Sequence, residues 1–184
     1  MSNYQRIYIP GGMYFFTLVT YKRLSFLTSP HARKVLRESW RDVQGKFEFS
    51  LIALCLLPDH LHCIWKLPDN DSDYSTRWKM IESAFSININ PAFLPHVKRS
   101  NSRIKKREAV VWQRRFWEHT IRDQSDLHRH IDYIHFNPVK HGCVSRAAEW
   151  PWSTFHRYLS LGVYGPDWGD ISEKDRYSIR TAGE

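Results

Sequence analysis

The spacing of hydrophobic residues along this 184-residue chain switches between strand-like and helix-like patterns. Residues 12–22, GMYFFTLVTYK, are rich in aromatic and β-branched side chains, which favours a strand. Ser29 and Pro30 then provide a cap and a first-turn residue, and apolar residues follow at helical spacing to about residue 44. The chain is therefore expected to open with a strand followed by a helix.

The most hydrophobic part of the chain predicts a pair of strands. Residues 47–57 and residues 60–67 are both apolar, and Pro58 and Asp59 interrupt them. Such a short interruption favours an antiparallel pair joined by a turn. A second helix is predicted over residues 73–87, where Trp78, Ile81 and Phe85 recur at helical spacing.

The remaining pattern completes an α+β arrangement. After a basic loop, residues 110–122 are predicted to be extended, with a bend near Arg114, and Asp123 or Ser125 can cap a last helix that carries Leu127, Ile131 and Ile134 on one face. The order β α β β α β α predicts a ferredoxin-like sandwich, an antiparallel sheet with helices mainly on one face. We expect one domain over residues 1–160 and a polar tail, loosely docked or disordered, over residues 161–184.

Composition limits the class of protein. A chain of this length with 42% hydrophobic residues can build one ordinary core. It has no apolar run of about 18 residues and no secretory pattern at its start, so no membrane span is expected. Three cysteines at irregular spacing suit a reducing compartment rather than a disulfide framework. A cytoplasmic protein is predicted.

Positive charge is concentrated in one segment. The formal net charge is +8, and VKRSNSRIKKRE supplies six basic residues, Lys98, Arg99, Arg103, Lys105, Lys106 and Arg107. Such a run can be a merely solvated surface. The adjacent WQRRFW places Arg114 and Arg115 among three aromatic residues, which favours single-stranded or hairpin nucleic acid with bases free to stack.

Two histidines interrupt the apolar segment LCLLPDHLHCIW. If residues 60–67 form a strand, His60 and His62 project from the same face, about 6.6 Å apart at Cα. Two imidazoles at this spacing can hold one metal ion. Histidine pairs also occur by chance on half-exposed strands, so a metal site needs a third ligand.

Tyr133 and Asn137 lie four residues apart on the last predicted helix, hence on one face of it. Because Pro138 disfavours a helical conformation for the preceding residue, we expect Asn137 at the end of the helix. An amide oxygen could complete the metal shell while the phenol acts as nucleophile. A C-cap role for Asn137 and a core role for Tyr133 are the commoner alternatives.

The motifs PDHLH, VWQRRFWEHTIRD and DYIHFNPVKHG, with the basic segment between the first two, resemble the REP-associated tyrosine transposases, relatives of the insertion-sequence single-strand transposases among the HUH endonucleases. The resemblance spans about residues 14–155. It implies that His60 and His62 bind a divalent cation, that Asn137 is the third ligand and that Tyr133 is the nucleophile. Related insertion-sequence enzymes commonly have glutamine at the third-ligand position, and this chain has the shorter Asn137.

The resemblance implies a metal-dependent endonuclease and strand transferase. Its substrates would be single-stranded DNA at palindromic REP hairpins, its intermediate a 5′-phosphotyrosine, its cofactor Mg²⁺ or Mn²⁺, and its active form a monomer working at the nucleoid. Asp59, His119 and His130 are candidates for the base. A hairpin-binding protein without catalysis and a metal-dependent nuclease that activates water remain alternatives.

Overall fold

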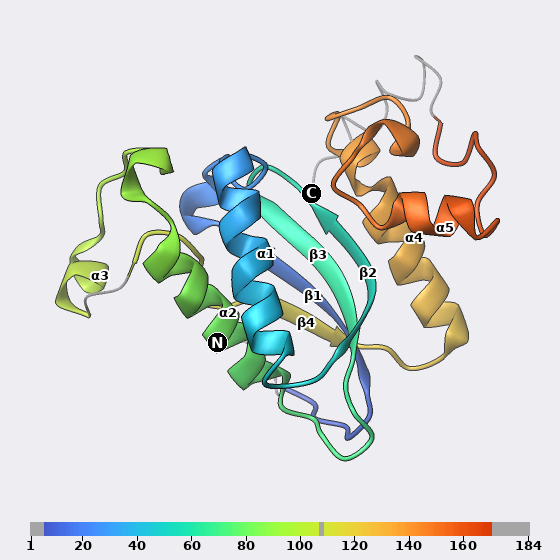
Figure 1. Ribbon diagram of the computed structural model, residues 1–184, viewed down its shortest axis with the longest axis horizontal. Helices are drawn as coiled ribbons and strands as arrows, with labels where there is room; N and C mark the ends of the chain where they lie inside the picture. Colours follow the sequence, from blue (N-terminus) through green and yellow to red (C-terminus); the bar gives the residue numbers. More distant parts are fainter. Residues whose placement is uncertain (1–5, 107–108, 171–184) are drawn as a thin grey trace.

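A single antiparallel sheet organises the computed structural model, which describes residues 6–106 and 109–170. Its strands are β1 (Met13–Val19), β2 (Ser50–Leu56), β3 (His60–Lys66) and β4 (Trp117–Thr120), in the order β2-β3-β1-β4 (Figure 1). This order and the succession βαββαβ are those of a ferredoxin-like sandwich. The predicted α+β class is confirmed, and β1 and β3 occupy the centre of the sheet.

Helices α1 (Pro30–Gln44) and α2 (Tyr74–Asn88) pack on one face of the sheet (Figure 1). The Ser29 side chain accepts a hydrogen bond from the backbone N–H of Ala32, and the Asp73 carboxylate accepts one from that of Thr76. These caps satisfy donors that the first turn leaves unpaired. Both helices therefore begin where the sequence predicts, to within one residue.

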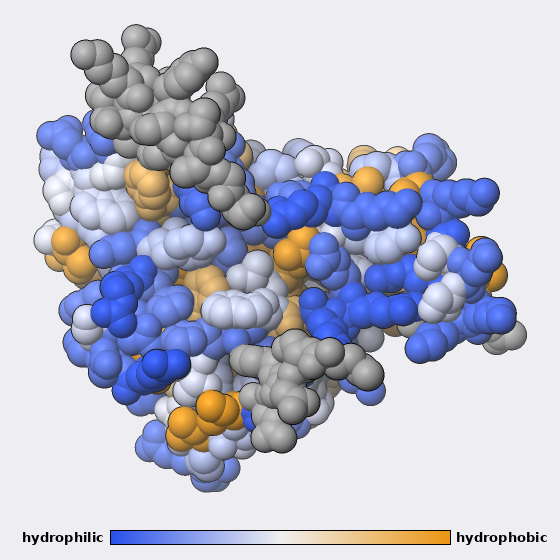
Figure 2. Space-filling view, turned by 180° about the vertical axis from the view of Figure 1, so that it is seen from behind, coloured by the Kyte–Doolittle hydropathy of each residue, from blue (hydrophilic) through white to orange (hydrophobic). Residues whose placement is uncertain are grey.

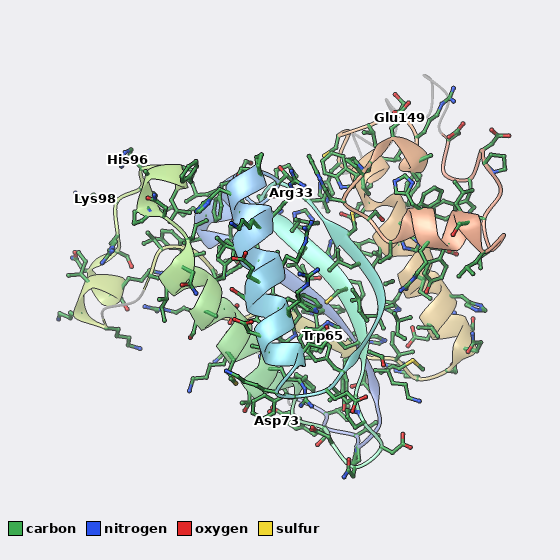
Figure 3. The ribbon with its side chains drawn as sticks, viewed as in Figure 1. Arg33, Trp65, Asp73, His96, Lys98 and Glu149 are labelled. Carbon is green, nitrogen blue, oxygen red and sulfur yellow. The ribbon has the colours of Figure 1, made fainter. Side chains whose placement is uncertain are left out.

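The core beneath these helices is aromatic. Trp65 of β3, labelled in Figure 3, stacks on Trp78 of α2, with ring centroids 4.1 Å apart and planes 16° apart. Phe16 and Trp40 contact both rings. All four side chains belong to one buried cluster. Because side chains alternate along a strand, this packing turns the even-numbered residues of β3 toward the opposite face.

Helix α4 (Gln124–Lys140) covers that opposite face. Its residues Leu127, Ile131 and Ile134 pack with Phe15 and Ile64 of the sheet. The prediction placed the helices mainly on one face; two of the three long helices lie there, and α4 supplies the second layer. The sheet is thus buried on both sides, which the sequence pattern of the last helix did not reveal.

Helix α4 continues beyond Asn137, so the prediction that it ends at this residue was wrong. Pro138 lies inside the helix, and the chain stays helical to Lys140. Proline removes one N–H donor, but the next bonds form, including that from His141 N–H to Asn137 C=O at 2.9 Å. Burial of Val139 in the second core layer stabilises this last turn against the local preference of the residue before proline.

Short elements occupy the segments predicted as loop or extended chain. A 3-10 turn η1 (Tyr21–Arg23) replaces the end of the first predicted strand. The turn η2 (Pro91–Phe93) precedes the basic segment, and α3 (Asn101–Lys105) lies within it. Of the predicted extended residues 110–122, only β4 and an isolated bridge between Thr20 and Trp112 pair with the sheet. The segment that carries α3 projects from the sheet beside α2 (Figure 1). Its described residues, 94–106 and 109–115, are called the arm from here on.

The C-terminal part folds back on α4 and β2. The turn η3 (Ala147–Glu149) and helix α5 (Phe155–Ser160) were not predicted, and Trp152 and Thr154 exchange backbone hydrogen bonds with the outer edge of β2. Buried Tyr164 donates a hydrogen bond to Asp132 of α4 at 2.8 Å. Residues 161–170 therefore dock on the domain, and residues 171–184 of the predicted tail lie outside the described residues.

The three cysteines are all free thiols, with Cys55 and Cys63 buried and Cys143 exposed. Across residues 6–106 and 109–170, no helix is both long enough and apolar enough to cross a membrane.

The stacked tryptophans make a prediction about stability. We expect Trp65→Ala to lower the free energy of unfolding by about 3–5 kcal/mol, because it opens a cavity inside a closed aromatic cluster. Ile87→Ala, on the exposed side of α2 with 80% of its surface accessible, should change it by less than about 0.5 kcal/mol. Urea unfolding followed by circular dichroism measures both, and equal effects would contradict this account of the core.

Candidate metal and nucleophile site

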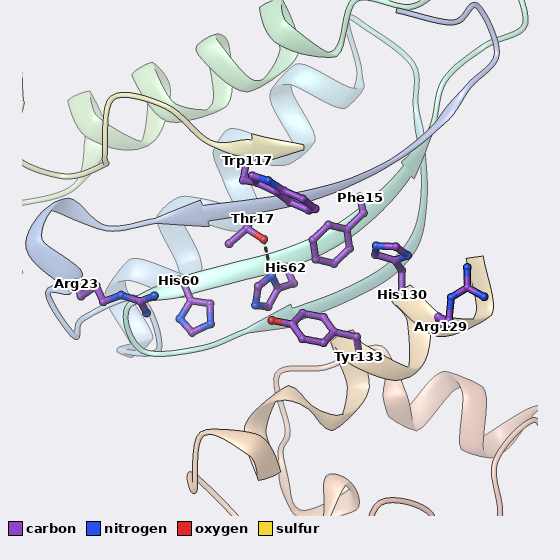
Figure 4. Close-up of a pocket in the computed structure, with 9 residues that line it drawn as sticks. All are labelled: Phe15, Thr17, Arg23, His60, His62, Trp117, Arg129, His130 and Tyr133. Atoms are coloured by element: carbon purple, nitrogen blue, oxygen red, sulfur yellow. Dashed lines mark hydrogen bonds between the residues drawn. The ribbon is translucent and has the colours of Figure 1, made fainter. Parts of the chain in front are cut away.

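Strand β3 delivers both histidines to the α4 side of the sheet. His60 and His62 are 3% and 4% exposed, and their ring centroids lie 4.9 Å apart (Figure 4). Leu61 and Cys63, between and after them, belong to the aromatic layer on the other face. The alternation expected from the sequence is thus the geometry that brings the two imidazoles together.

Each imidazole is held through its Nδ1 atom. His60 Nδ1 lies 2.6 Å from Asp59 Oδ1, and His62 Nδ1 lies 2.8 Å from the hydroxyl of Thr17, its partner across the β1–β3 ladder. Burial alone would raise the pKa of Asp59, but the hydrogen bond from His60 and the charge of Arg23 outweigh it and hold this pKa below its usual value. The bond between Asp59 and His60 Nδ1 orients the ring so that Nε2 faces Asn137.

Asn137 meets these histidines from α4. Its side chain is fully buried, and its Oδ1 lies 3.4 Å from His60 Nε2. Within the described residues, His62 Nε2 and Asn137 Nδ2 are buried without a hydrogen-bond partner. Leaving a buried polar atom unpaired costs about 1–3 kcal/mol. The unpaired His62 Nε2 therefore fits a site that a bound ion completes, with Asn137 Oδ1 as the amide atom able to bind that ion.

The donor set suits a divalent cation. Burial, with a smaller contribution from the nearby charge of Lys140, lowers the pKa of His62 well below its usual value, so its ring stays neutral. Two imidazole nitrogens and an amide oxygen leave coordination positions open for substrate oxygens. His60, His62 and Asn137 could therefore hold Mg²⁺ or Mn²⁺, and imidazole donors favour the latter.

Tyr133 lies one turn before Asn137 on α4 and faces the same space. Its ring centroid is 5.2 Å from that of His62, and 38% of its surface is exposed. Figure 4 shows the hydroxyl directed toward His62. Lys140 Nζ lies 5.2 Å from the centre of the ring. Tyr133 is therefore neither a core residue nor on the far side of the sheet from the imidazoles.

Sequence reasoning missed several neighbours of this site. His141, which follows the last residue of α4, places its ring centroid 4.9 Å from that of His60. Thr17 and Arg23 reach the site from β1 and the turn after it. His141 could have been suspected from its place in the DYIHFNPVKHG motif, but Thr17 is found only from the pairing register of β1 with β3.

Two of the three base candidates form a separate cluster. His119 Nε2 lies 2.8 Å from Asp126 Oδ2, and His130 Nδ1 lies 3.2 Å from Asp126 Oδ1, with the two imidazoles stacked 4.6 Å apart. Although burial would raise the pKa of Asp126, the bonds from His119 and from the Arg122 amide lower it to about 2. The three donors lie within 4.8 Å of one another, close enough to suggest a cation site. Unlike the donors around His62, they are already paired with each other, so the cluster ties β4 to the first turn of α4.

The predicted DNA-contacting residues separate into two groups. Arg103 is buried, and its guanidinium donates to the carbonyl oxygens of Ala109 and Trp112 and lies over the ring of Tyr21. This placement favours a role in fixing the arm rather than in binding phosphate. The exposed members of the set are Lys98, Arg99, Lys105, Lys106, Arg114 and Arg115, while Arg107 lies outside the described residues.

The exposed cations give the arm a hydrophilic surface. Lys98 projects near its outer edge (Figure 3), and hydrophilic residues dominate the right-hand end of the molecule in Figure 2, where the arm lies. Among the three flanking aromatics, Trp112 is buried and Phe116 half-buried, whereas Trp117 is 52% exposed. Only Trp117 of the three thus presents a largely open ring.

Comparison with known proteins agrees with this geometry. The family described as "Transposase IS200 like" matches residues 10–137, which include both histidines, Tyr133 and Asn137. This chain belongs to the IS200-like transposase family. It is therefore an enzyme of the transposase class, as the motifs predicted.

Two named relatives and one solved structure extend the comparison. The REP-associated tyrosine transposase of Escherichia coli K12 is 40% identical over 175 residues, covering 94% of each chain, and a Haemophilus influenzae relative is 41% identical over 169 residues, covering 92% of this chain and 94% of its own. A solved REP-associated tyrosine transposase bound to a REP hairpin matches with a TM-score of 0.75 and 39% identity, over 94% of both chains. The resemblance predicted from the motifs is confirmed.

The arrangement of His60, His62 and Asn137 leads to a prediction about Mn²⁺ affinity. We expect His60→Ala/His62→Ala to abolish saturable Mn²⁺ binding, because two of the three donors are lost, while the far-UV circular dichroism spectrum stays that of the wild type. Asp59→Asn, which keeps both imidazoles but weakens the bond that orients His60, should lower Mn²⁺ affinity by about 10- to 100-fold.

Mn²⁺ binding is measured by electron paramagnetic resonance of the free ion. The exposed His96→Ala is the matched control and should bind as the wild type does. Undiminished Mn²⁺ binding in the double variant would exclude His60 and His62 as ligands.

Proposed function

We propose that this chain is a metal-dependent endonuclease and strand transferase that cleaves single-stranded DNA at REP-like hairpins through Tyr133. The observation that carries the proposal is the buried, unpaired Nε2 of His62, which lies with His60 and the Asn137 amide oxygen beside the partly exposed Tyr133. A nucleophile and an incomplete ligand set that share one open space suit attack on a phosphodiester.

The proposed reaction exchanges one phosphoester for another. Tyr133 Oη forms a bond to phosphorus as the bond to the 3′ oxygen breaks, and the phenolic proton is transferred by way of solvent to the departing oxygen. The products are a 5′-phosphotyrosine and a free 3′ hydroxyl. Attack by another 3′ hydroxyl reverses the step and joins strands, so no nucleotide cofactor is needed.

Each residue of the site has a separate role in the proposed reaction. A divalent cation held by His60, His62 and Asn137 would polarise the phosphate and stabilise the leaving oxygen. Asp59 and Thr17 keep the imidazoles oriented. The rigid turn of α4 between Tyr133 and Asn137 fixes the distance between the nucleophile and the ligand set. Asp59 is paired with His60 and Arg23. His119 and His130 are both paired with Asp126. These pairings argue against Asp59, His119 or His130 as the base that deprotonates Tyr133.

Hairpin DNA is proposed as the substrate because a solved relative, 39% identical, is bound to a REP hairpin. The exposed lysines and arginines of the arm suit the phosphates of a stem, which carry charge but no sequence information. Action as a monomer stays a prediction.

Replacement of the nucleophile tests the mechanism. We expect Tyr133→Phe to abolish cleavage and covalent attachment to a labelled REP-like hairpin while hairpin affinity changes less than about threefold, because only the reacting oxygen is removed. Denaturing gel electrophoresis detects the adduct, and peptide mapping places it on one tyrosine. Tyr158→Phe, on α5, is the matched control and should form the adduct normally.

Two other outcomes of this experiment would each support one of the alternative functions. Cleavage by wild type with no adduct would indicate a nuclease that activates water. Hairpin binding with no cleavage under any divalent cation would indicate a binding protein without catalysis.

The basic arm makes a second prediction. We expect Lys105→Ala/Lys106→Ala to weaken hairpin binding and to reduce the slope of log affinity against log salt concentration by about 1–2, because each lost phosphate contact releases one counterion fewer. Lys34→Ala/Lys46→Ala, which removes two exposed charges at α1, is the control for net charge. Fluorescence anisotropy across a salt series measures the slope, and an unchanged slope in the arm variant would exclude these lysines.

A further inference from the structure

The site opens into a trough that is larger than the catalytic groups need. A cavity of about 550 Å³ extends from the histidines along β1, β4 and α4. Arg23 stands at one end and Arg129 at the other, with Tyr133 on the floor and Trp117 on the wall (Figure 4). None of the described residues that line it is acidic. Its size and charge suit an anionic, extended ligand.

Trp117 is presented to this trough as a rigid platform. The edge-to-face contact of its ring with Phe15, at 5.5 Å and 73°, supports it from below, and His119 lies parallel to it within 5°. Yet 52% of its surface is exposed. An indole held in place by its neighbours and open on one side is suited to stacking an unpaired base.

Arg23 is positioned by an unusual turn. Lys22 and Arg23 both have left-handed backbone conformations, with φ of 55° and 54°. Such residues persist where the surroundings fix them. Here the Thr20 hydroxyl contacts the carbonyl of Leu24, just after the turn, and that of Asp59, in the connection between β2 and β3. The result directs the Arg23 guanidinium toward the His60 end of the trough, where it pairs with Asp59 at 3.3 Å and stays half exposed.

We propose that the trough is the subsite for the unpaired nucleotides beside the cleaved phosphate, with one base stacked on Trp117 and a phosphate oxygen bound by Arg23. This assignment rests on the proposed function and adds to it the path of the single strand. A guanidinium carries five N–H donors in a planar fork, a geometry that suits contact with a carboxylate and a phosphate oxygen together. The strand runs from Arg23, past Tyr133, toward Arg129.

Binding without chemistry tests the platform. In a Tyr133→Phe background with chelator present, affinity is measured for a REP-like hairpin with and without an unpaired extension. We expect Trp117→Ala to lower affinity for the extended hairpin by about 5- to 150-fold, the range for loss of one stacked base, and to leave the bare hairpin unaffected. Trp117→Phe should lose less than Trp117→Ala.

The control for the platform is Phe47→Ala, which removes a 38% exposed ring that does not line the trough and should change neither affinity. Equal affinity of the Trp117→Ala and parent proteins for the extended hairpin would overturn the platform. So would an equal loss of affinity for the extended and bare hairpins.

A charge scan along the extension tests Arg23. Each linkage in turn is replaced by a neutral methylphosphonate. For the parent protein we expect one linkage at which the replacement weakens binding, and in Arg23→Ala that same replacement should have no further effect. Arg37→Ala, on the exposed side of α1, should keep the full effect. A replacement effect that survives in Arg23→Ala would show that Arg23 does not bind the phosphate.

These binding outcomes are separate from the outcome for catalysis. If the wild type forms the covalent adduct but hairpin binding does not depend on Trp117 or Arg23, the subsite is refuted and the proposed function is not. Trp117-dependent and Arg23-dependent binding without any adduct would support a strand-binding trough and refute the cleavage reaction.

Discussion

Strand β3 is paired on both edges and covered on both faces, and the rest of the structure depends on this double burial. Its odd-numbered side chains, led by Trp65, complete the aromatic layer under α1 and α2. Its even-numbered residues include His60 and His62, which α4 encloses. A one-residue shift in register would put imidazoles among the tryptophans, so packing of the aromatic layer also fixes the direction of the histidines.

Burial makes the hydrogen bonding of the imidazoles decisive. A buried polar group without a partner is unfavourable, and each ring resolves half of its requirement through Nδ1, to Asp59 or to Thr17. His60 Nε2 lies 3.4 Å from Asn137 Oδ1, whereas His62 Nε2 finds a partner only when a ligand enters the site. A ligand that binds there would remove the free-energy cost of the unpaired nitrogen and so stabilise the folded protein. The same burial lowers the pKa of His62, which keeps its ring neutral and able to bind a cation.

Helix α4 links packing to chemistry. Its apolar face closes the second core layer, its first turn is tied to β4 through Asp126, and its last turns carry Tyr133 and Asn137. Continuation through Pro138 matters for the site, because it holds Asn137 inside a packed helix rather than at a free end. Tyr133 and Asn137 thus share one rigid helix, while the basic arm projects separately from the sheet (Figure 1).

The sequence by itself determined the strands and long helices, because apolar periodicity and the caps at Ser29, Asp73 and Asp123 act locally. It also determined that His60 and His62 share a face, since alternation along a strand leaves no other choice. What it could not determine depends on contacts between distant segments. The pre-proline rule misplaced the end of α4, since burial of Val139 outweighs a local preference. The count of basic residues could not distinguish the inward Arg103 from its exposed neighbours, because net charge carries no information about direction. The position of α4 on the second face, which brings Tyr133 and Asn137 to the imidazoles, was decided by tertiary packing alone.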